Sequence, residues 1–234
     1  MKRYRWVLVI IIVAIIAFTG VYLNGVFRDA KEKIAQLKAL KELHNLEIKT
    51  FALDSLKEGD IIFHKSLSAQ SQAIQLATHS VYTHCGIIYK DESGYFVYEA
   101  IGPVKRTHLT EWMGRGEKGA YVVKRLKNAH QILTPSTLQK LKQVGYQYQG
   151  KQYDKCFEWS NDKMYCSELV WKMYKAATGL EIGKLQRLAS FDLQSDVVRK
   201  LMAERYGKKI PLDEPVISPA SIFDSELLVP VGQL

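Results

Sequence analysis

The sequence predicts an α+β domain that follows an N-terminal membrane segment, and three observations carry this prediction. Residues 6–23 form an uncharged run, WVLVIIIVAIIAFTGVYL, which is long enough to cross the core of a bilayer. Residues 83–100 have the pattern of two strands joined by a glycine-containing turn, which indicates an antiparallel hairpin. From Cys166 onward, apolar residues recur at helical spacing until Gly179, which predicts a helix packed on a core.

Length and composition limit the domain count and the classes of partner. With 234 residues, 47% of them hydrophobic, the chain can bury one core, so one domain is expected. The net charge of +9 is spread among alternating lysines and acidic residues, and no long basic block is present. Nucleic acid is therefore not an expected partner. A basic surface suits an anionic membrane or an acidic cell-wall polymer better.

The N-terminal segment, residues 1–25, is predicted to be an uncleaved signal anchor. Its apolar run exceeds the usual ~7–15 residues of a cleaved signal peptide, and no good cleavage site follows it. Lys2, Arg3 and Arg5 precede the run, and basic flanks favour the cytoplasmic side. The expected location is the cell membrane, with a single pass and the domain outside the cytoplasm. The alternative is a cleaved signal and a secreted domain.

Residues 26–50 are predicted to form a helical stalk, because a narrow apolar stripe runs through a sequence rich in lysine, glutamate and leucine. The stripe consists of Ile34, Leu37, Leu40 and Leu43. It is too short for a strong prediction of a dimerising coiled coil. The remaining residues, 51–234, are expected to form the domain.

The domain is expected to alternate between short strands and helices. The predicted elements are a buried strand ending at residue 63, a helix over 68–78 with Ser68 as its N-cap, a hairpin of strands over 83–89 and 95–100, a short helix or loop over 107–116, a strand over 120–125, and helices over 133–148 and 194–206. Aromatic residues in the loop 147–159 either line a cleft or fill the gap between helix and sheet. The stretch 184–206 is a candidate lid.

The register of the hairpin brings a histidine and a glutamate together. With the turn at residues 91–94, Ile88 lies opposite Val97 and Gly86 lies opposite Glu99. His84 is then the diagonal neighbour of Glu99 on the same face, about 7–8 Å away between backbones. Glycine at the facing position leaves room for both side chains. A carboxylate at an apolar strand position is costly to bury alone, and orienting an imidazole would explain it.

Cys166 is the candidate nucleophile, because it lies in the first turn of its predicted helix. Unpaired N–H groups and the positive end of the helix dipole favour a thiolate there. The alternative is an ordinary buried cysteine. Cys85 competes for the role, but it points away from His84 in the middle of a strand, which predicts a core position. The third cysteine, Cys156, forms no metal-binding spacing with the others.

Cys166, His84 and Glu99 together make a set of nucleophile, base and orienting carboxylate. The remaining histidines have no partner at metal spacing and are expected at the surface or behind the site: His64, His79, His108 and His130. Asp60 and Asp154 could also orient a histidine, but the sequence gives no geometric reason for either. We expect neither a metal nor another cofactor.

Four motifs in order, and a closing segment after them, resemble the permuted papain-like amidases, the YiiX-like branch of the NlpC superfamily of cysteine hydrolases. They are GDIIF at 59–63, THCGI at 83–87, YEA at 98–100, YCSEL at 165–169 and ISPASI at 217–222. The resemblance covers residues 53–231. It implies a circularly permuted papain-like fold, in which an antiparallel sheet precedes the nucleophile helix. In ordinary papain-like enzymes the cysteine comes before the histidine.

The resemblance also implies roles for individual residues. His84 matches the family's base, Glu99 its third polar residue and Cys166 its nucleophile. Tyr165 resembles a residue that lines the site and assists the oxyanion hole. Cys85 departs from the family, which often has a small apolar residue such as valine at this position, and its thiol is expected to substitute quietly.

These expectations lead to a membrane-anchored cysteine hydrolase that cleaves amide bonds through a thioacyl intermediate. Cell-wall stem peptides are the expected substrates. One alternative is a lipid-directed thiol hydrolase or acyltransferase that acts on lipid amides or esters, similar to the lecithin:retinol acyltransferase relatives of the superfamily. The other alternative is a catalytically silent binding module that keeps the fold.

Overall fold

The structure is a computed structural model that describes residues 27, 31–38, 40 and 55–233. Backbone contacts divide the chain into two units, residues 1–53 and 54–234. Residues 31–38 are helical with exposed side chains. No helix among the described residues is long and apolar enough to cross a bilayer. The predicted anchor at 6–23 lies outside these residues, as does most of the predicted stalk.

The domain is built on a six-stranded antiparallel sheet in the order β4-β3-β2-β1-β5-β8. A separate two-stranded ribbon pairs β6 with β7. The strands of the sheet are β1 (Ile61–His64), β2 (His84–Asp91), β3 (Gly94–Ala100), β4 (Val104–His108), β5 (Val122–Leu126) and β8 (Leu228–Gln233). The ribbon consists of β6 (Gln186–Arg187) and β7 (Pro215–Val216).

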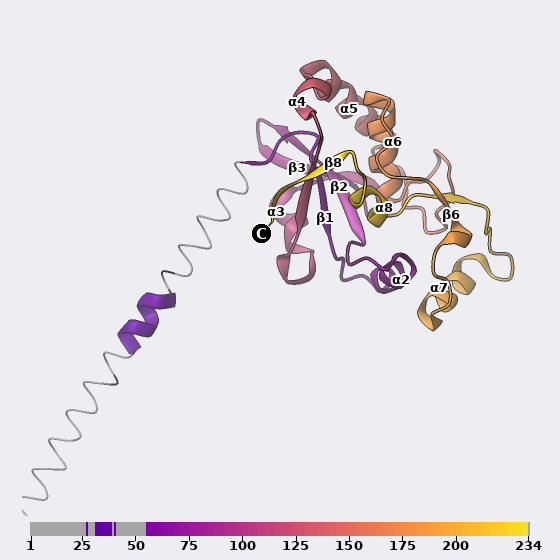
Figure 1. Cartoon of the computed structure of the whole chain (residues 1–234), viewed down its shortest axis with the longest axis horizontal. Helices are drawn as coiled ribbons and strands as arrows, with labels where there is room; N and C mark the ends of the chain where they lie inside the picture. Colours follow the sequence, from indigo (N-terminus) through magenta and orange to yellow (C-terminus); the bar gives the residue numbers. More distant parts are fainter. Residues whose placement is uncertain (1–26, 28–30, 39, 41–54, 234) are drawn as a thin grey trace, which may run out of the picture. The chain divides into compact units, whose positions relative to one another are not determined.

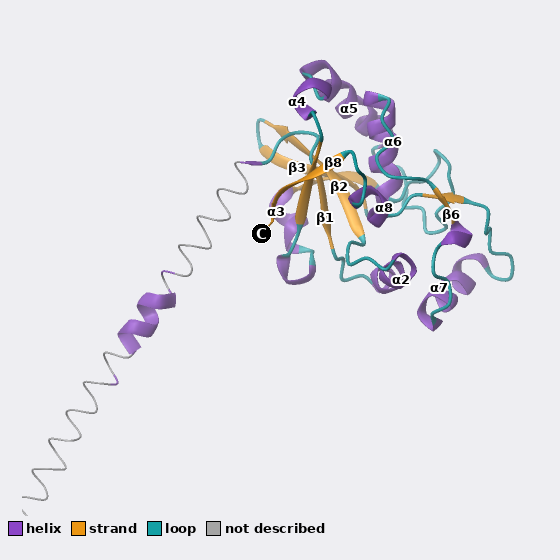
Figure 2. Cartoon of the chain, in the orientation of Figure 1, coloured by secondary structure: helices purple, strands orange, loops and turns teal. Residues whose placement is uncertain are grey.

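Helices and long loops surround the sheet (Figure 2). The helices are α2 (Ala69–Thr78), α3 (Leu109–Gly114), α4 (Ala129–Ile132), α5 (Pro135–Tyr148), α6 (Cys166–Thr178), α7 (Asp196–Tyr206) and α8 (Pro219–Phe223). The helices predicted over 68–78, 133–148 and 194–206 are confirmed as α2, α5 and α7. Their N-caps are Ser68, Thr134 and Ser195.

The two faces of the central strands are covered by different helices, because side chains alternate along a strand. Cys85, Ile87 and Tyr98 belong to the main core, which includes the apolar face of α6. On the other face, Trp112 of α3 stacks on His64 with ring centroids 4.1 Å apart. In Figure 1, α3 and α6 lie on opposite sides of the strands. Helix α6, which begins at Cys166, is thus packed on the sheet as predicted.

The predicted hairpin register is confirmed. Ile88 pairs with Val97, and Ile87 pairs with Tyr98, so Gly86 and Glu99 follow at the next position. A methyl group on Gly86 would lie 2.4 Å from Val97 Cγ1 and 2.6 Å from the Tyr98 carbonyl oxygen. Two real contacts at these distances are impossible without movement of the backbone. Glycine is therefore required for β2 and β3 to approach this closely.

The short helix or loop predicted over 107–116 contains α3, but the strand that precedes α3 was not predicted. Strand β4 occupies residues 104–108 and only then does α3 begin. The sequence VKRTH is polar and gives no apolar alternation, because β4 is an edge strand whose pairing with β3 is mainly through backbone groups. Strand β8 was not predicted either, since Pro230 and Gly232 lie within it and both residue types are uncommon in strands.

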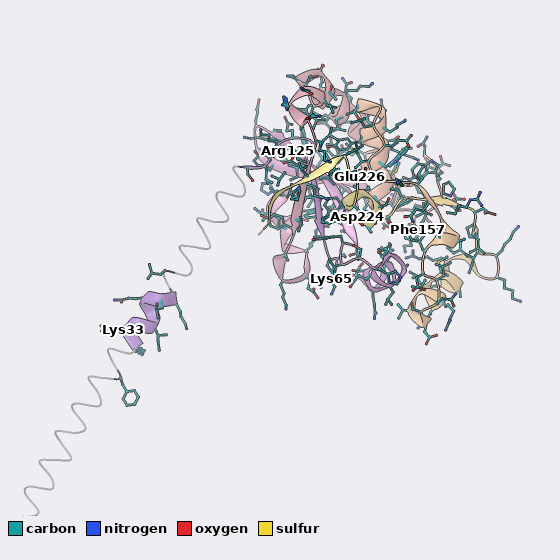
Figure 3. All side chains as sticks on the ribbon, viewed as in Figure 1. Lys33, Lys65, Arg125, Phe157, Asp224 and Glu226 are labelled. Atoms are coloured by element: carbon teal, nitrogen blue, oxygen red, sulfur yellow. The ribbon has the colours of Figure 1, made fainter. Side chains whose placement is uncertain are left out.

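A buried ion pair ties the first strand to the fifth. Arg125, labelled in Figure 3, donates to both carboxylate oxygens of Asp60 at 2.7 Å. The Asp60 side chain is fully buried. This pairing accounts for Asp60, which the sequence left as a weak candidate for orienting a histidine.

Candidate active site

Helix α6 places Cys166 at its first position, as the sequence predicts. Tyr165 is the N-cap residue, and the Glu168 carboxylate accepts a hydrogen bond from the Tyr165 N–H at 3.3 Å. The helix ends at Gly179, whose φ of 78° lies in the left-handed region that favours glycine. Cys166 is only 3% exposed, so its thiol lies in a desolvated position at the positive end of the helix.

His84 and Glu99 are in direct contact on the opposite face of the sheet. His84 Nε2 lies 2.7 Å from Glu99 Oε2, and the Glu99 side chain is fully buried. Because Nε2–H donates to the carboxylate, Nδ1 is the ring nitrogen left for Cys166. The structure therefore brings together two of the predicted site residues through the predicted register.

Two further residues hold Glu99, and the sequence did not predict either of them. The Thr107 hydroxyl donates to Glu99 Oε1, and the Arg115 guanidinium forms an ion pair with the same oxygen. Burial alone raises the pKa of Glu99, but the bond from His84 and the other two donors outweigh it and lower the pKa to about 2. Glu99 is thus a fixed carboxylate at any physiological pH.

Cys166 and His84 are in contact, and the directions of their pKa shifts favour a thiolate–imidazolium pair. His84 is the first residue of β2. At the end of a strand, a side chain from one face of the sheet can reach a residue on the other face, and His84 reaches Cys166 in this way. The Cys166 thiol hydrogen-bonds His84. Burial lowers the pKa of His84, but the charge of Cys166 and the contact with Glu99 outweigh burial and raise the pKa to about 9. At neutral pH, the shared proton is therefore on the His84 imidazole and not on the Cys166 sulfur.

Cys85 lies in the core, as predicted, and it also contacts Cys166. Its side chain is fully buried as predicted, but it hydrogen-bonds Cys166, and its backbone N–H donates to the same sulfur. These contacts, the side-chain bond first, hold the pKa of the Cys166 thiol well below its usual range. Burial raises the pKa of Cys85 itself, so Cys85 keeps its proton and acts as the donor. All three cysteines are free thiols.

An aromatic stack supports His84 from behind. The His64 ring lies 5.2 Å from the His84 ring and stacks on Trp112. Burial, followed by the nearby charge of His84, lowers the pKa of His64 to about 3, so His64 is neutral. It is a buried residue beside the site, whereas His79 and His108 are exposed.

Two other candidates from the sequence lie outside the contact network of His84. Asp154 accepts hydrogen bonds from the N–H groups of Cys156 and Glu158 at 2.8 and 2.6 Å, and so fixes the loop ahead of α6. Tyr165 is buried beside Cys166, and its hydroxyl accepts a hydrogen bond from the Ile217 N–H at 3.1 Å. Its assistance to an oxyanion stays a prediction.

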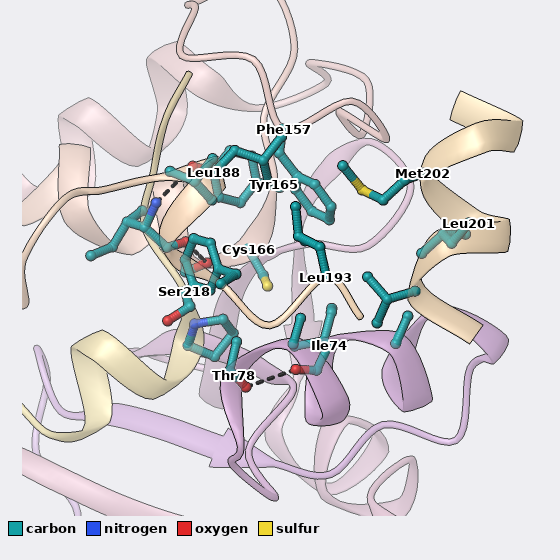
Figure 4. A pocket seen from close by; sticks show the side chains of 18 of the residues that line it. Ile74, Thr78, Phe157, Tyr165, Cys166, Leu188, Leu193, Leu201, Met202 and Ser218 are labelled. Carbon is teal, nitrogen blue, oxygen red and sulfur yellow. Dashed lines mark hydrogen bonds between the residues drawn. The ribbon is translucent and has the colours of Figure 1, made fainter. Parts of the chain in front are cut away.

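A pocket opens beside Cys166 on the side away from the sheet. Its walls come from α2, the loop before α6, the start of α6, the segment 188–202 and the segment 216–219. Figure 4 shows the Cys166 sulfur among Ile74, Leu193 and Ser218, with Leu201 and Met202 of α7 farther along the pocket. The aromatic loop contributes Tyr153 and Phe157 to the lining, whereas Trp159 packs edge-on against Trp171.

The chain resembles known proteins over most of its domain. Residues 55–231 match the family described as permuted papain-like amidase enzymes, YaeF/YiiX, C92 family. The uncharacterized protein YiiX of Escherichia coli K12 is 49% identical over 175 residues, which cover 75% of this chain and 85% of that protein. A solved structure, described as the metalloprotein YiiX of Escherichia coli O157:H7, has a TM-score of 0.73 and 48% identity, and the match covers 76% of this chain and 97% of that one.

The description of that relative as a metalloprotein raises the question of a metal site in this chain. Among the described residues 27, 31–38, 40 and 55–233, no group of three or more His, Cys, Asp or Glu side chains is placed to hold one ion. The carboxylate of Glu99 is already taken by His84, Thr107 and Arg115. The residues of this site therefore do not fit a metal centre.

Proposed function

This chain belongs to the permuted papain-like amidase family, and from this premise we propose that it is a cysteine hydrolase of amide bonds. The observation that carries the proposal is the chain of contacts from Cys166 to His84 to Glu99. A thiolate at a helix N-terminus, an imidazole beside it and a carboxylate on the far ring nitrogen are the parts that nucleophilic catalysis by cysteine requires. Six antiparallel strands and the packed α6 hold them in place.

The proposed reaction has two steps. The Cys166 thiolate attacks the carbonyl carbon of the substrate, and the C–N bond breaks as the His84 imidazolium gives its Nδ1 proton to the leaving amine. The product of this step is a thioester on Cys166. Neutral His84 then takes a proton from water, the hydroxide attacks the thioester, and the acid product leaves. The site returns to the thiolate–imidazolium pair.

Glu99 and backbone groups assist both steps in this proposal. Glu99 holds the imidazole in one orientation and stabilises its charged form, since it stays ionised while His84 gains and loses a proton. The backbone N–H of Cys166 lies in the first turn of α6, where it has no helical acceptor, and it is our candidate donor to the oxyanion. Tyr165 is proposed to shape the site.

We also propose that residues 1–25 anchor the protein in the cell membrane with the domain outside the cytoplasm. The support comes from the sequence, namely the uncharged run at 6–23 and the basic residues Lys2, Arg3 and Arg5 before it. Such an anchor would keep the site close to a membrane surface.

The reaction class can be tested with an electrophilic amide-mimicking probe on the full-length chain purified in detergent. We expect labelling and hydrolysis of acyl aminocoumarins by the natural chain, with both lost in Cys166→Ala. His84→Ala should slow labelling on the order of a hundredfold or more. The matched control is Cys156→Ala, since the Cys156 thiol contacts the Arg205 carbonyl oxygen rather than the site.

Hydrolysis that persists in Cys166→Ala would overturn the proposed nucleophile. A natural chain that neither reacts with the probe nor hydrolyses any amide would instead favour the silent binding module.

A further inference from the structure

Two thiols meet at the candidate active site. Cys85 is the second residue of β2, and Cys166 is the first residue of α6. The Cys85 thiol and the Cys85 backbone N–H both hydrogen-bond the Cys166 sulfur. Two contacts from one residue to one sulfur place the pair side by side, and both cysteines are free. The proposed reaction uses only the Cys166 sulfur as a nucleophile, so a second sulfur stands within reach of the first.

The fold keeps these two thiols together. Alternation along β2 turns the Cys85 side chain toward α6, on the face that it shares with Ile87. Pairing with Phe63 of β1 fixes the strand at Cys85. On the helix, the fully buried Leu169 follows Cys166 by one turn and holds α6 against the core. A disulfide bond is about 2 Å long, so the two sulfurs need to approach by about 1–2 Å from their hydrogen-bonded position.

An oxidant meets the two thiols under different conditions. Cys166 lines a pocket that is partly open to solvent, whereas Cys85 is fully buried and does not line it. The contacts with Cys85 and His84 favour the thiolate of Cys166 and lower its pKa, while burial raises the pKa of Cys85. A thiolate that a small oxidant can reach, with a protonated thiol beside it, is typical of a cysteine that is oxidised first and a neighbour that then forms a disulfide with it.

We propose that a hydroperoxide joins Cys85 to Cys166 in a disulfide, and that this reversible modification switches the active site off. The inference rests on the proposed function and adds regulation by oxidation to it. The disulfide leaves no thiolate at Cys166 for attack on a carbonyl, and a small thiol reductant restores it. The domain is proposed to lie outside the cytoplasm, where disulfides form and persist.

The modification has two steps. The Cys166 thiolate attacks one oxygen of the peroxide, the O–O bond breaks, and the leaving hydroxide takes a proton from the His84 imidazolium to become water. Cys166 is now a sulfenic acid, with its sulfur oxidised by two electrons and the peroxide reduced by two. The Cys85 sulfur then attacks the Cys166 sulfur, the S–O bond breaks, and the Cys85 proton leaves with the hydroxyl group as a second water.

Cys85 also limits the damage that the oxidant can do. A sulfenic acid with no thiol beside it reacts with more peroxide to a sulfinic and then a sulfonic acid, and thiol reductants do not reverse these products. The chain has three cysteines, and the third, Cys156, has its Sγ 3.9 Å from the Arg205 carbonyl oxygen rather than at the site. Cys85 is therefore the thiol that is placed to intercept the sulfenic acid.

The test treats the reduced full-length protein in detergent with hydrogen peroxide, after free reductant has been removed. Remaining thiols are blocked with iodoacetamide, and the peptides are identified by mass spectrometry. We expect a peptide pair joined through Cys85 and Cys166, and a loss of amide hydrolysis, on the order of tenfold or more, that follows the joined fraction. Dithiothreitol should separate the two peptides and restore most of the hydrolysis.

Cys85→Ser is the variant that isolates the disulfide, because its hydroxyl can still donate to the Cys166 sulfur but cannot join it. In this variant peroxide should add oxygen atoms to Cys166, and dithiothreitol should restore little of the lost hydrolysis. Cys156→Ala is the matched control and should keep both the joined peptides and the recovery. The joined peptides of the natural chain are a readout that does not depend on the folding of any variant.

The outcomes separate this inference from the proposed function. The inference is wrong if Cys166 of the natural chain gains oxygen as readily as in Cys85→Ser, if it joins Cys156 instead, or if the joined chain hydrolyses amides at the full rate. If Cys85 and Cys166 join reversibly but the reduced chain hydrolyses no amide, the disulfide stands and the proposed function fails.

Discussion

Cys166 contacts residues from two faces of one strand, and both lower the pKa of its thiol. Cys85 donates from the face that carries α6, and His84 pairs with the thiolate from the strand end on the other face. The side chain of Cys85 thus packs in the core and also donates a hydrogen bond to Cys166. In the proposed reaction Cys85 is a positioning residue, because it acts on the proposed nucleophile Cys166 and not on the substrate.

Removal of the Cys85 thiol should raise the pKa of Cys166, because the hydrogen bond from Cys85 is the largest contribution that lowers it. In Cys85→Ala, the rate of alkylation by iodoacetamide should reach its half-maximum at a higher pH than in the natural chain. Cys156→Ala is the control and should keep the profile. An unchanged profile in Cys85→Ala would show that Cys85 has only a packing role.

The pH dependence of hydrolysis should follow the protonation states of Cys166 and His84. The active form needs Cys166 without its proton and His84 with one, so kcat/KM should rise with deprotonation of Cys166 and fall as pH passes about 9, where His84 loses its proton. Glu99→Gln removes a charge that raises the pKa of His84, so the alkaline limb should move to lower pH and kcat/KM should fall on the order of a hundredfold or more.

Glu117→Gln is the control for this measurement. Glu117 pairs with Lys65 in a half-exposed ion pair near the site, and its loss should leave the alkaline limb near its original pH. If the alkaline limb of the pH profile lies at the same pH in Glu99→Gln as in the natural chain, Glu99 does not raise the pKa of His84.

The sequence predicted His84 and Glu99 as partners because strand alternation and a short turn fix which residues share a face. It did not predict Thr107 or Arg115. Their contacts with Glu99 depend on the pairing of β4 with β3 and on the course of the chain after α3. A polar edge strand carries no pattern from which that pairing can be derived.

At the scale of elements, the contact of β2 with β3 depends on Gly86. A Cβ at this position would meet a backbone carbonyl, which cannot move aside as a flexible side chain can. We expect Gly86→Ala to lower the free energy of unfolding by about 1–3 kcal/mol, measured by urea denaturation. Gly102→Ala is the control, because a Cβ there has no neighbour within 4 Å, and its effect should stay within about 0.5 kcal/mol. Equal midpoints for the two variants would contradict the close approach.

The helices were the most predictable elements. Each of α2, α5, α6 and α7 has a distinct beginning or end in the sequence, such as Ser195 before α7 or Gly179 after α6. The strands β4 and β8 and the ribbon of β6 and β7 were missed. They are short or lie at edges, where tertiary contacts decide the backbone conformation more than local propensity does.

At the scale of the whole molecule, the pocket could not have been predicted. Its walls come from residues 73–78, 153–167, 188–202 and 216–219, which are brought together only by the fold. The sequence indicated an aromatic loop and a candidate lid, and members of both line the pocket. Opening and closing of that lid stays a prediction, as do the anchor and the stalk.

The proposed anchor gives a prediction for the full-length chain. It should remain in the membrane fraction during alkaline carbonate extraction and be released by detergent. Ile12→Arg with Ile15→Arg should release it, because each arginine costs about 2.5 kcal/mol or more at the centre of a membrane helix. Ala35→Arg with Gln36→Arg adds the same charge to the exposed helical residues 31–38, and this variant should stay bound. Release of the natural chain by carbonate alone would contradict the anchor.

The polar groups that line the pocket beside Cys166 are hydrogen-bonded to the protein itself, and this has a thermodynamic consequence. Water inside it finds few partners, since Thr78, Ser167 and Tyr165 are bonded to the protein, and such water is held weakly. An apolar ligand that displaces it into bulk solvent should bind with a negative heat-capacity change and a favourable enthalpy at 25 °C, as apolar ligands do in preformed, poorly hydrated pockets. Titration calorimetry with a small apolar ligand at several temperatures would reveal both signatures.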